Sequence, residues 1–289
     1  MRYKLQLLLA AIALTLLIGI AYHEYTFTLK QGSSKNLLVY VPPVLYKPVS
    51  EYTEVFERTS RVKVYVSVGA TGVLISRVES TREGDVLFTA DHLFMEKAIS
   101  KGLVDSTTVR VVSYLIPAIL VRRGNPSNIT GIRDLVEKPL RIGVADPETA
   151  PFGRIAVEIL KRAGVYEYVR DRLITYSDVG LTARQLALGL VDVAILPYTA
   201  KYWFPEELDL VWFSPEEIRG LVSCQLVAVI PFSKNREPAE VFISNFTAWL
   251  AENSLRLGYI SKPEDIANFT PYNMSDLDLP KICLQGVRG

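Results

Sequence analysis

The chain has 289 residues, which is enough for one large domain or two medium-sized domains with substantial cores. Its 32 basic and 31 acidic residues nearly cancel, and this balance argues against a nucleic-acid-binding protein, which needs a surplus of Lys and Arg to bind phosphate backbones. The two histidines, His23 and His92, and the two cysteines, Cys224 and Cys283, match no spacing of zinc ligands. We therefore expect neither a nucleic-acid partner nor a metal site built from side chains.

The N-terminus has the pattern of an export signal. Two basic residues, Arg2 and Lys4, precede an apolar run over residues 5–21, which suits either a signal peptide or a single membrane anchor. Because no A-x-A cleavage site and no lipobox cysteine follows this run, we favour an anchor over residues 1–21. The positive flank then lies in the cytoplasm and the bulk of the chain outside. The polar stretch 22–36 is predicted to be a linker.

The predicted export bears on the two cysteines, Cys224 and Cys283. Disulfides form and persist outside the cytoplasm, so we expect one disulfide between these residues. Two buried free thiols are the alternative. A disulfide would hold the C-terminal tail, from Tyr272 onward, against the lobe that contains Cys224.

From residue 37 onward, short apolar runs alternate with amphipathic segments. The first elements predicted along the chain are strands at 37–41, 62–68 and 85–90 and helices at 49–60, 72–80 and 91–102. A second series, which begins near residues 118–124, has strands at 140–147, 173–177 and 191–197 and helices at 151–164 and 181–190. The last elements before the tail are a strand at 224–230 and a helix at 238–254.

Strands that alternate with helices in this way predict βαβ units and largely parallel sheets. The predicted fold class is therefore α/β, and the length fits two lobes with the chain crossing between them. We expect the first lobe to begin with residues 37–114 and the second lobe to span 115–215. Residues 216–289 then return to the first lobe and include the tail.

Three strand ends share an unusual composition. The segments VYVPPVL, VSVGATG and GVADPETAPFG each run from an apolar strand through Pro, Gly or Ala into a helix. In open α/β sheets, ligands bind beyond the carboxyl ends of the strands, where helix N-termini meet. These loops offer backbone amides and the hydroxyls of Thr71 and Thr149 but almost no Lys or Arg, so hydrogen bonds and helix dipoles could hold a small dianion. Ordinary strand-to-helix turns are the alternative interpretation.

From about Leu37 to Leu250, the order of segments resembles the periplasmic molybdate/tungstate-binding proteins of ABC importers. The resemblance is carried by VSVGATGVL, GDVLFTADHLFMEKAISKGLVD, RIGVADPETAPFGRIAVEILKRAGV and YSDVGLTARQLALGLVDVAI. It implies a type II periplasmic-binding-protein fold, whose two lobes, each a mostly parallel sheet flanked by helices, close on a ligand in the cleft between them. It also implies an exported, monomeric binding protein that is not an enzyme and has no cofactor, with molybdate or tungstate as ligand and an ABC permease as membrane partner.

The resemblance also implies which positions bind the anion. A family hydroxyl falls on Thr71, where threonine can do the work of serine. Backbone amide donors fall on Phe152, in the turn that contains Pro151 and Gly153, and on Val179. The two amide positions require only a backbone N–H, so the types of their side chains neither support nor oppose the role.

Two positions depart from the family pattern. A family serine falls on Val44, which keeps its amide but has no hydroxyl, and the family tyrosine falls on Pro197, with Tyr198 one position later. We retain Val44 as an amide donor and Tyr198 as a candidate phenol donor. The lost hydroxyl leaves open another small anion, such as sulfate, phosphate or an organic acid, and an anchored receptor of the same fold is a further alternative. An enzyme is disfavoured, because no nucleophile–base pair and no Walker-type loop appears.

Overall fold

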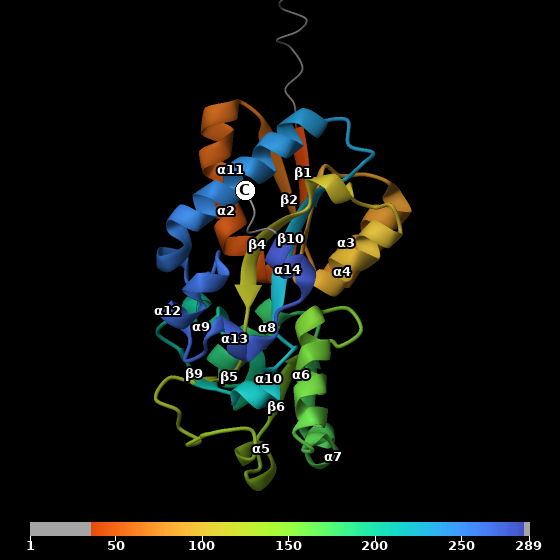
Figure 1. Cartoon of the computed structure of the whole chain (residues 1–289). Coiled ribbons are helices and arrows are strands. Elements are labelled where there is room, and N and C mark those ends of the chain that lie inside the picture. The colour runs from red at the N-terminus through yellow and green to blue at the C-terminus, as the bar shows by residue number, and fades with distance from the viewer. Residues whose placement is uncertain (1–35, 286–289) are drawn as a thin grey trace, which may run out of the picture.

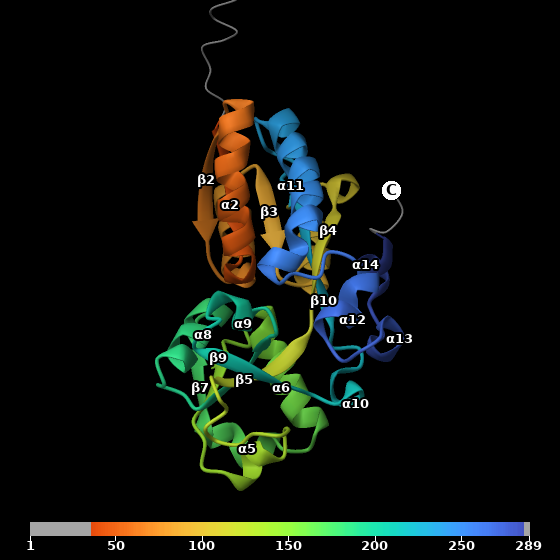
Figure 2. The ribbon, with the colours of Figure 1, turned by 90° about the vertical axis from the view of Figure 1, so that its left-hand side faces the viewer.

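The structure, a computed structural model, describes residues 36–285. These residues form two α/β lobes that are stacked end to end (Figure 1, Figure 2). The N-terminal and C-terminal parts of the described chain build one lobe, and the middle part builds the other. Each lobe has a five-stranded sheet with helices on its faces. The predicted two-lobed α/β fold is therefore confirmed.

The sheet of the first lobe has the strand order β2-β1-β3-β10-β4. Its strands are β1 (Asn36–Val41), β2 (Lys63–Val68), β3 (Val86–Thr89), β4 (Arg110–Leu115) and β10 (Ser223–Val229). β1 pairs in parallel with β2 and with β3, whereas β10 is antiparallel to both of its neighbours, β3 and β4. In this sheet only β10, which returns from the second lobe, therefore runs against the other strands.

The sheet of the second lobe repeats this arrangement with the order β7-β6-β8-β5-β9. Its strands are β5 (Pro117–Arg122), β6 (Ile142–Ala145), β7 (Leu173–Tyr176), β8 (Val193–Pro197) and β9 (Leu208–Trp212). β6 is parallel to β7 and β8, and β5 is antiparallel to β8 and β9. Every residue of the central strands β6 and β8 is buried, as is typical of strands that helices cover on both faces.

Helices of nine or more residues cover these sheets, and shorter helices fill the connections and the C-terminal tail. The longer helices are α2 (Pro43–Ser60), α3 (Thr71–Thr81), α4 (His92–Ser100), α6 (Pro151–Arg162), α8 (Val179–Ala187) and α11 (Arg236–Leu257). The shorter ones are α5 (Asp134–Glu137), α7 (Tyr166–Val169), α9 (Ala200–Trp203), α10 (Pro215–Ile218), α12 (Ile266–Phe269), α13 (Met274–Leu277) and α14 (Lys281–Gln285). In Figure 2, α2 and α11 lie side by side on the first lobe.

The helix predicted at 49–60 begins earlier than predicted, because α2 starts at Pro43 and contains Pro48. Proline is well suited to the first position of a helix, where its missing N–H needs no partner. Pro48 cannot donate to the carbonyl of Val44, four residues before it. The hydroxyl of Tyr259 donates to that carbonyl instead, so the helix continues past the proline without an unpaired buried acceptor.

The chain crosses between the lobes twice. The first crossing is Ile116, between β4 and β5, and the second lies between β9 and β10. The sequence analysis named neither β4 nor β9 as a strand. Both of these strands lie at an edge of their sheet beside the antiparallel strand. Their sequences, RVVSYL and LDLVW, are nevertheless rich in β-branched and aromatic residues, which are typical of strands, so the prediction missed a local signal.

The C-terminal tail packs across the second crossing and is tied to the first lobe. A disulfide joins Cys224 of β10 to Cys283 of α14, and the hydroxyl of Tyr114 donates to the carbonyl of Cys283 at 2.7 Å. The hydroxyl of Tyr272 donates to the carbonyl of Phe213 in the crossing segment, also at 2.7 Å. The tail therefore links the crossing segment between β9 and β10 to the strands β4 and β10 of the first lobe.

Among residues 36–285, no helix is long and apolar enough to cross a membrane. The predicted anchor, residues 1–21, and residues 22–35 of the predicted linker lie outside the described residues.

Removal of the disulfide should lower the stability of the first lobe. In the Cys224→Ser, Cys283→Ser variant, the unfolded chain regains the freedom of a loop with a sequence separation of 59 residues. We expect the free energy of unfolding, measured by urea titration, to fall by about 3 kcal/mol. A reducing agent should produce a similar loss in the parent protein and no further loss in the variant. Equal unfolding midpoints for parent and variant would contradict the stabilising role.

Candidate functional site

Four helices begin at the junction of the lobes and surround one small cavity. α2 and α3 come from the first lobe, and α6 and α8 from the second. The residues that line the cavity are Pro42, Pro43, Val44, Ala70, Thr71, Ala90, Ala150, Pro151, Phe152, Asp178 and Val179. Its volume is about 20 Å³. Sites for organic ligands are usually several hundred Å³, so this chamber as it stands is far too small for an organic ligand.

The cavity brings together four of the five predicted ligand positions, Val44, Thr71, Phe152 and Val179. Each lies at the first or second residue of its helix, where the backbone amide has no acceptor within the helix. Within residues 36–285, no protein group accepts a hydrogen bond from any of these four amides. Four unpaired donors, two from each lobe, therefore border a single chamber.

The hydroxyl of Thr71 is positioned to act as a fifth donor. Thr71 is almost fully buried, and its hydroxyl oxygen accepts a hydrogen bond from the amide of Ala90 at 3.2 Å. A hydroxyl carries one proton as well as its lone pairs. Because the contact with Ala90 occupies a lone pair, the proton of Thr71 remains available to a ligand oxygen in the cavity.

The cavity has no positively charged side chain, so helix ends supply its positive potential. Each helix N-terminus carries the equivalent of roughly half a positive charge. Asp178 is the one charged residue in the lining, and both of its oxygens are occupied by its own lobe. They accept from the amide of Leu181 at 2.9 Å and from the hydroxyl of Ser177 at 3.0 Å.

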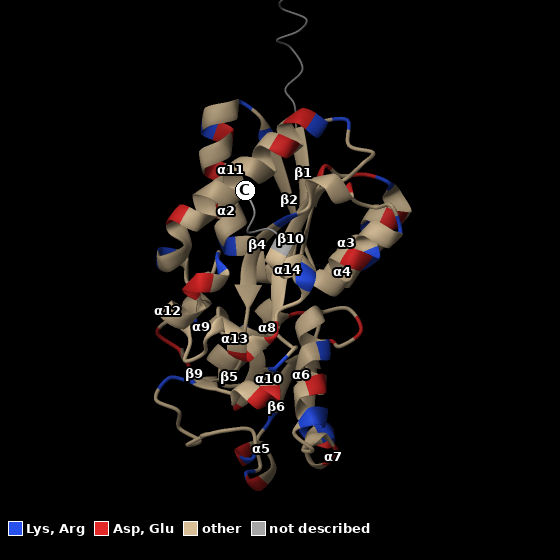
Figure 3. Cartoon of the chain, in the orientation of Figure 1, with Lys and Arg blue, Asp and Glu red and all other residues tan. Residues whose placement is uncertain are grey.

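No cluster suited to a metal ion occurs beside the cavity or elsewhere in the described part of the chain, where three or more His, Cys, Asp or Glu side chains nowhere converge. Charges of both signs are spread over both lobes instead (Figure 3). The chemistry available in the cavity is therefore hydrogen-bond donation from amides and a hydroxyl.

Contacts between the lobes close the protein around this cavity. The amide of Gly72 in α3 donates to the carbonyl of Thr149 in the second lobe at 3.0 Å. Arg154 of α6 forms an ion pair of 2.8 Å with Asp91 of the first lobe, whose side chain is fully buried. These contacts join loops that lie beyond the strand ends of opposite lobes. The structure is thus a closed form of a two-lobed protein.

The structure does not place the fifth predicted residue, Tyr198, in the lining of the cavity. Its ring packs in an aromatic cluster, with centroid distances of 6.2 Å to Tyr202, 6.1 Å to Trp212 and 6.2 Å to Phe269. Its hydroxyl lies near the backbone of Ile260 without hydrogen-bond geometry. Burial raises the pKa of Tyr198 well above its usual value, so the phenol stays protonated. A tyrosine directly after a strand faces whichever elements pack there, and here these are α9, β9 and α12.

Asp178 is the lining residue that the sequence analysis missed. It is the N-cap of α8, and an Asp directly before a helical segment is a recognised N-cap signal. The segment YSDVG was used only to locate the amide of Val179. Attention to capping would have placed this carboxylate next to that amide and therefore at the edge of the cavity.

A cavity between two lobes of equal topology is the arrangement of a binding protein that holds its ligand between its lobes. A family model described as bacterial extracellular solute-binding protein matches residues 37–247. The chain belongs to this family, which comprises solute-binding proteins and not enzymes.

Individual relatives are distant. The molybdate-binding protein ModA of Rhodobacter capsulatus is 21% identical over 209 residues, which cover 72% of this chain and 78% of the relative. The structure of the periplasmic molybdate-binding protein of Azotobacter vinelandii matches with a TM-score of 0.68 at 16% identity, over 78% of this chain and 98% of the other. The structure of the sulfate-binding protein SubI of Mycobacterium tuberculosis matches with the same TM-score and identity, over 84% of this chain and 96% of the other. The structural matches establish the shared fold.

Gly72 should be needed for full closure. A Cβ atom at this position would lie 3.0 Å from the carbonyl oxygen of Thr149 and 3.2 Å from the ring of Phe94. In the variant Gly72→Ala the carbonyl of Thr149 must therefore give way by a few tenths of an ångström, which opposes closure, although alanine favours the helix α3 by about 1 kcal/mol. We expect a smaller fraction of closed molecules, and hence a larger average radius of gyration by small-angle X-ray scattering with ligand present, and no loss of stability to urea.

The matched control for this substitution is Gly131→Ala. A Cβ atom at Gly131 meets no heavy atom within 4 Å, so the control should leave the scattering curve unchanged. A Gly72→Ala protein that closes to the same radius as the parent would show that the Gly72–Thr149 contact does not limit closure.

Proposed function

We propose that this protein is the extracytoplasmic binding component of an ABC importer and that its ligand is a tetrahedral oxyanion, molybdate or tungstate. The observation that supports this most directly is the convergence of four unpaired amides and the Thr71 hydroxyl on a chamber of about 20 Å³ that no Lys or Arg lines. Hydrogen bonds to a charged acceptor are roughly twice as strong as neutral ones. A compact dianion gains most from such a set of donors.

The binding step follows from the distribution of donors over the two lobes. Val44 and Thr71 belong to the first lobe, and Phe152 and Val179 to the second. An anion that enters the open cleft meets two amides at a time, whereas the closed protein offers all four. The ligand therefore binds the closed form more tightly and shifts the population toward it. This difference provides the signal that a membrane partner needs to distinguish loaded from empty protein.

The named relatives support the choice of oxyanion and the cellular role. Molybdate-binding proteins occur among both the sequence relatives and the structural matches. We infer that the protein works outside the cytoplasm, held by residues 1–21, and that it delivers its anion as a monomer to a permease in the membrane. The disulfide between Cys224 and Cys283 suits that compartment.

A second candidate ligand is sulfate, and the absence of hydroxyls at two positions favours it. Val44 contributes no hydroxyl, and Tyr198 lies outside the lining, so the only side-chain hydroxyl in the cavity is that of Thr71. A sulfate-binding protein is also among the structural matches. Sulfate and molybdate share their shape and charge but differ in size. The closed chamber can therefore discriminate between them mainly by how well its donors reach the oxygens.

Calorimetric titration of the purified protein with molybdate, tungstate, sulfate and phosphate, at one pH and salt concentration, tests the proposal. We expect submicromolar binding of molybdate and tungstate and binding at least about 100-fold weaker for the other two anions, which corresponds to about 2.7 kcal/mol. Tighter binding of sulfate or phosphate than of molybdate and tungstate would identify that anion as the ligand instead. The absence of heat with all four anions would reject an oxyanion ligand altogether.

The Thr71 hydroxyl should contribute measurably to affinity. The variant Thr71→Val keeps the shape of the side chain but loses the proton donor and the acceptor for the amide of Ala90. A lost hydrogen bond to a charged group costs about 1.5–3 kcal/mol, so the dissociation constant should rise about 10- to 100-fold in the same titration. The control is Thr149→Val, because the Thr149 hydroxyl donates to Asp146 in its own loop and lies outside the cavity. Equal effects of both variants would exclude a direct role for Thr71.

A further inference from the structure

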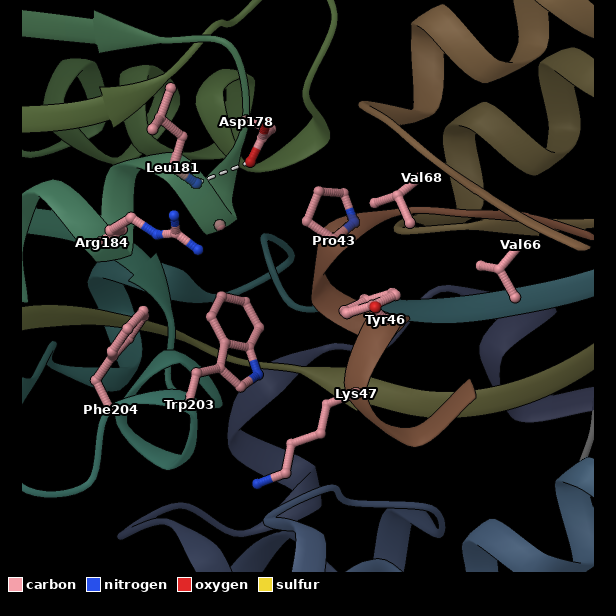
Figure 4. A pocket seen from close by; sticks show the side chains of 11 residues that line it. Pro43, Tyr46, Lys47, Val66, Val68, Asp178, Leu181, Arg184, Trp203 and Phe204 are labelled. Atoms are coloured by element: carbon pink, nitrogen blue, oxygen red, sulfur yellow. Dashed lines mark hydrogen bonds between the residues drawn. The ribbon is translucent and has the colours of Figure 1, made fainter. Parts of the chain in front are cut away.

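A second and larger pocket lies at the mouth of the cleft, outside the anion cavity (Figure 4). Its volume is about 680 Å³, which is within the usual range for small organic ligands. One wall comes from the start of α2 and the edge strand β2, and the other comes from α8 and the α9 segment. Because its two walls belong to different lobes, this outer pocket exists in full only when the lobes are closed.

The outer pocket is separate from the anion cavity. Pro43 and Asp178 line both spaces and form the partition between them. At this partition the lobes are in contact, since a Cβ atom placed on Gly180 would lie only 3.1 Å from the Cβ of Pro43. A ligand in the outer pocket therefore does not share the four amides of the inner chamber.

The surface of the outer pocket is mostly apolar and aromatic. Figure 4 shows Tyr46 on α2 facing Trp203 and Phe204 across the opening, and Val66 and Val68 extend the wall of the first lobe. Tyr46 is 49% exposed and Val68 is 46% exposed. The indole N–H of Trp203 donates to the hydroxyl of Tyr259 at 3.4 Å, which fixes the ring in place. A flat apolar ligand would remove this partly exposed surface from water.

Two cations flank this apolar surface. Lys47 lies on the wall of the first lobe and Arg184 on that of the second, on opposite sides of Trp203 (Figure 4). The guanidinium of Arg184 points toward the opening, whereas the amine of Lys47 points away from Arg184. Neither side chain forms an ion pair or a hydrogen bond with another residue of the described chain. The one carboxylate of the lining, Asp178, is already occupied by Leu181 and Ser177. The charged side chains of the outer pocket that have no partner are therefore both positive.

We propose that the outer pocket is an accessory binding site for an aromatic carboxylate, which inserts its ring between Tyr46 and Trp203 and places its charge against Arg184. An aromatic ring matches the flat side chains of both walls, and the carboxylate complements the guanidinium of Arg184, while Lys47 adds positive potential on the other side of the ring. Arg and Lys both donate hydrogen bonds to carboxylates, and Arg can do so through two parallel bonds. The ligand bridges the two lobes.

A bridging ligand favours the closed form and should therefore strengthen oxyanion binding. This consequence rests on the proposed function, in which the same closed form holds the anion. Coupling between two sites is reciprocal, so each ligand should raise the affinity for the other by the same factor. We expect a factor of about fivefold, at the lower end of common coupling strengths.

The test uses naphthoate as the probe and the neutral naphthamide as its uncharged match. Calorimetry measures the binding of each compound to the protein, both alone and with saturating molybdate. The test variant is Lys47→Gln combined with Arg184→Gln. The control variant is Arg133→Gln combined with Lys234→Gln. It removes two exposed cations outside the pocket whose side chains form no ion pair or hydrogen bond within residues 36–285.

We expect naphthoate to bind, naphthamide to bind more weakly, and the test variant to lose about tenfold in naphthoate affinity while the control variant does not. Naphthoate binding with this profile supports the accessory site even if molybdate gives no heat, so its outcome is independent of the proposed function. Equal binding of the acid and the amide, or no binding of naphthoate, overturns it. Self-association of the protein that the test variant abolishes, followed by light scattering, would assign the pocket to a second copy and would also overturn it.

Discussion

The structure depends on four backbone amides that face a small closed chamber without an acceptor. A buried N–H group without a partner costs about 1–3 kcal/mol, because it has lost its hydrogen bond to water. Val44, Thr71, Phe152 and Val179 would all bear this cost in a closed and empty protein. An open protein returns them to water, and under the proposed function an anion satisfies them together. In that proposal the same four groups favour opening when the site is empty and closure when it is filled.

Both lobes prepare these donors by related means. In α2 and α6 the first helical residue is a proline, Pro43 or Pro151, which has no N–H and fixes the backbone for the helix that follows. The first available amide is then that of the next residue, Val44 or Phe152. In α3 and α8 the donor is the first residue of the helix. Each lobe thus contributes one helix of each kind, which follows from the common topology of the two sheets.

How far the sequence predicts this site depends on whether a feature is local. The helix starts are local, since Pro or Gly after an apolar strand marks them, and they pointed to these loops as an anion site. The resemblance then assigned Val44, Thr71 and Phe152 within the loops. The direction of the Tyr198 side chain is not local. The ring packs in an aromatic cluster that includes Phe269, some seventy residues further along the chain. The edge strands β4 and β9 do carry a local signal, because RVVSYL and LDLVW are rich in β-branched and aromatic residues. Their partners in the sheet come from distant parts of the chain and are not local.

The tail also reaches the binding site through Val44. The amide of Val44 faces the cavity side of α2, while its carbonyl, left without a helical donor by Pro48, accepts from the hydroxyl of Tyr259. Tyr259 follows Gly258, whose left-handed backbone ends α11 and whose position leaves no room for a side chain beside Tyr202. The segment after Gly258 pairs with β4 through Tyr114, and Tyr114 in turn contacts Cys283 at the disulfide. A continuous chain of contacts thus runs from the disulfide, through Tyr114 and the segment after Gly258, to Val44 at the start of α2. The tail is therefore linked both to the second crossing and to the helix that borders the cavity.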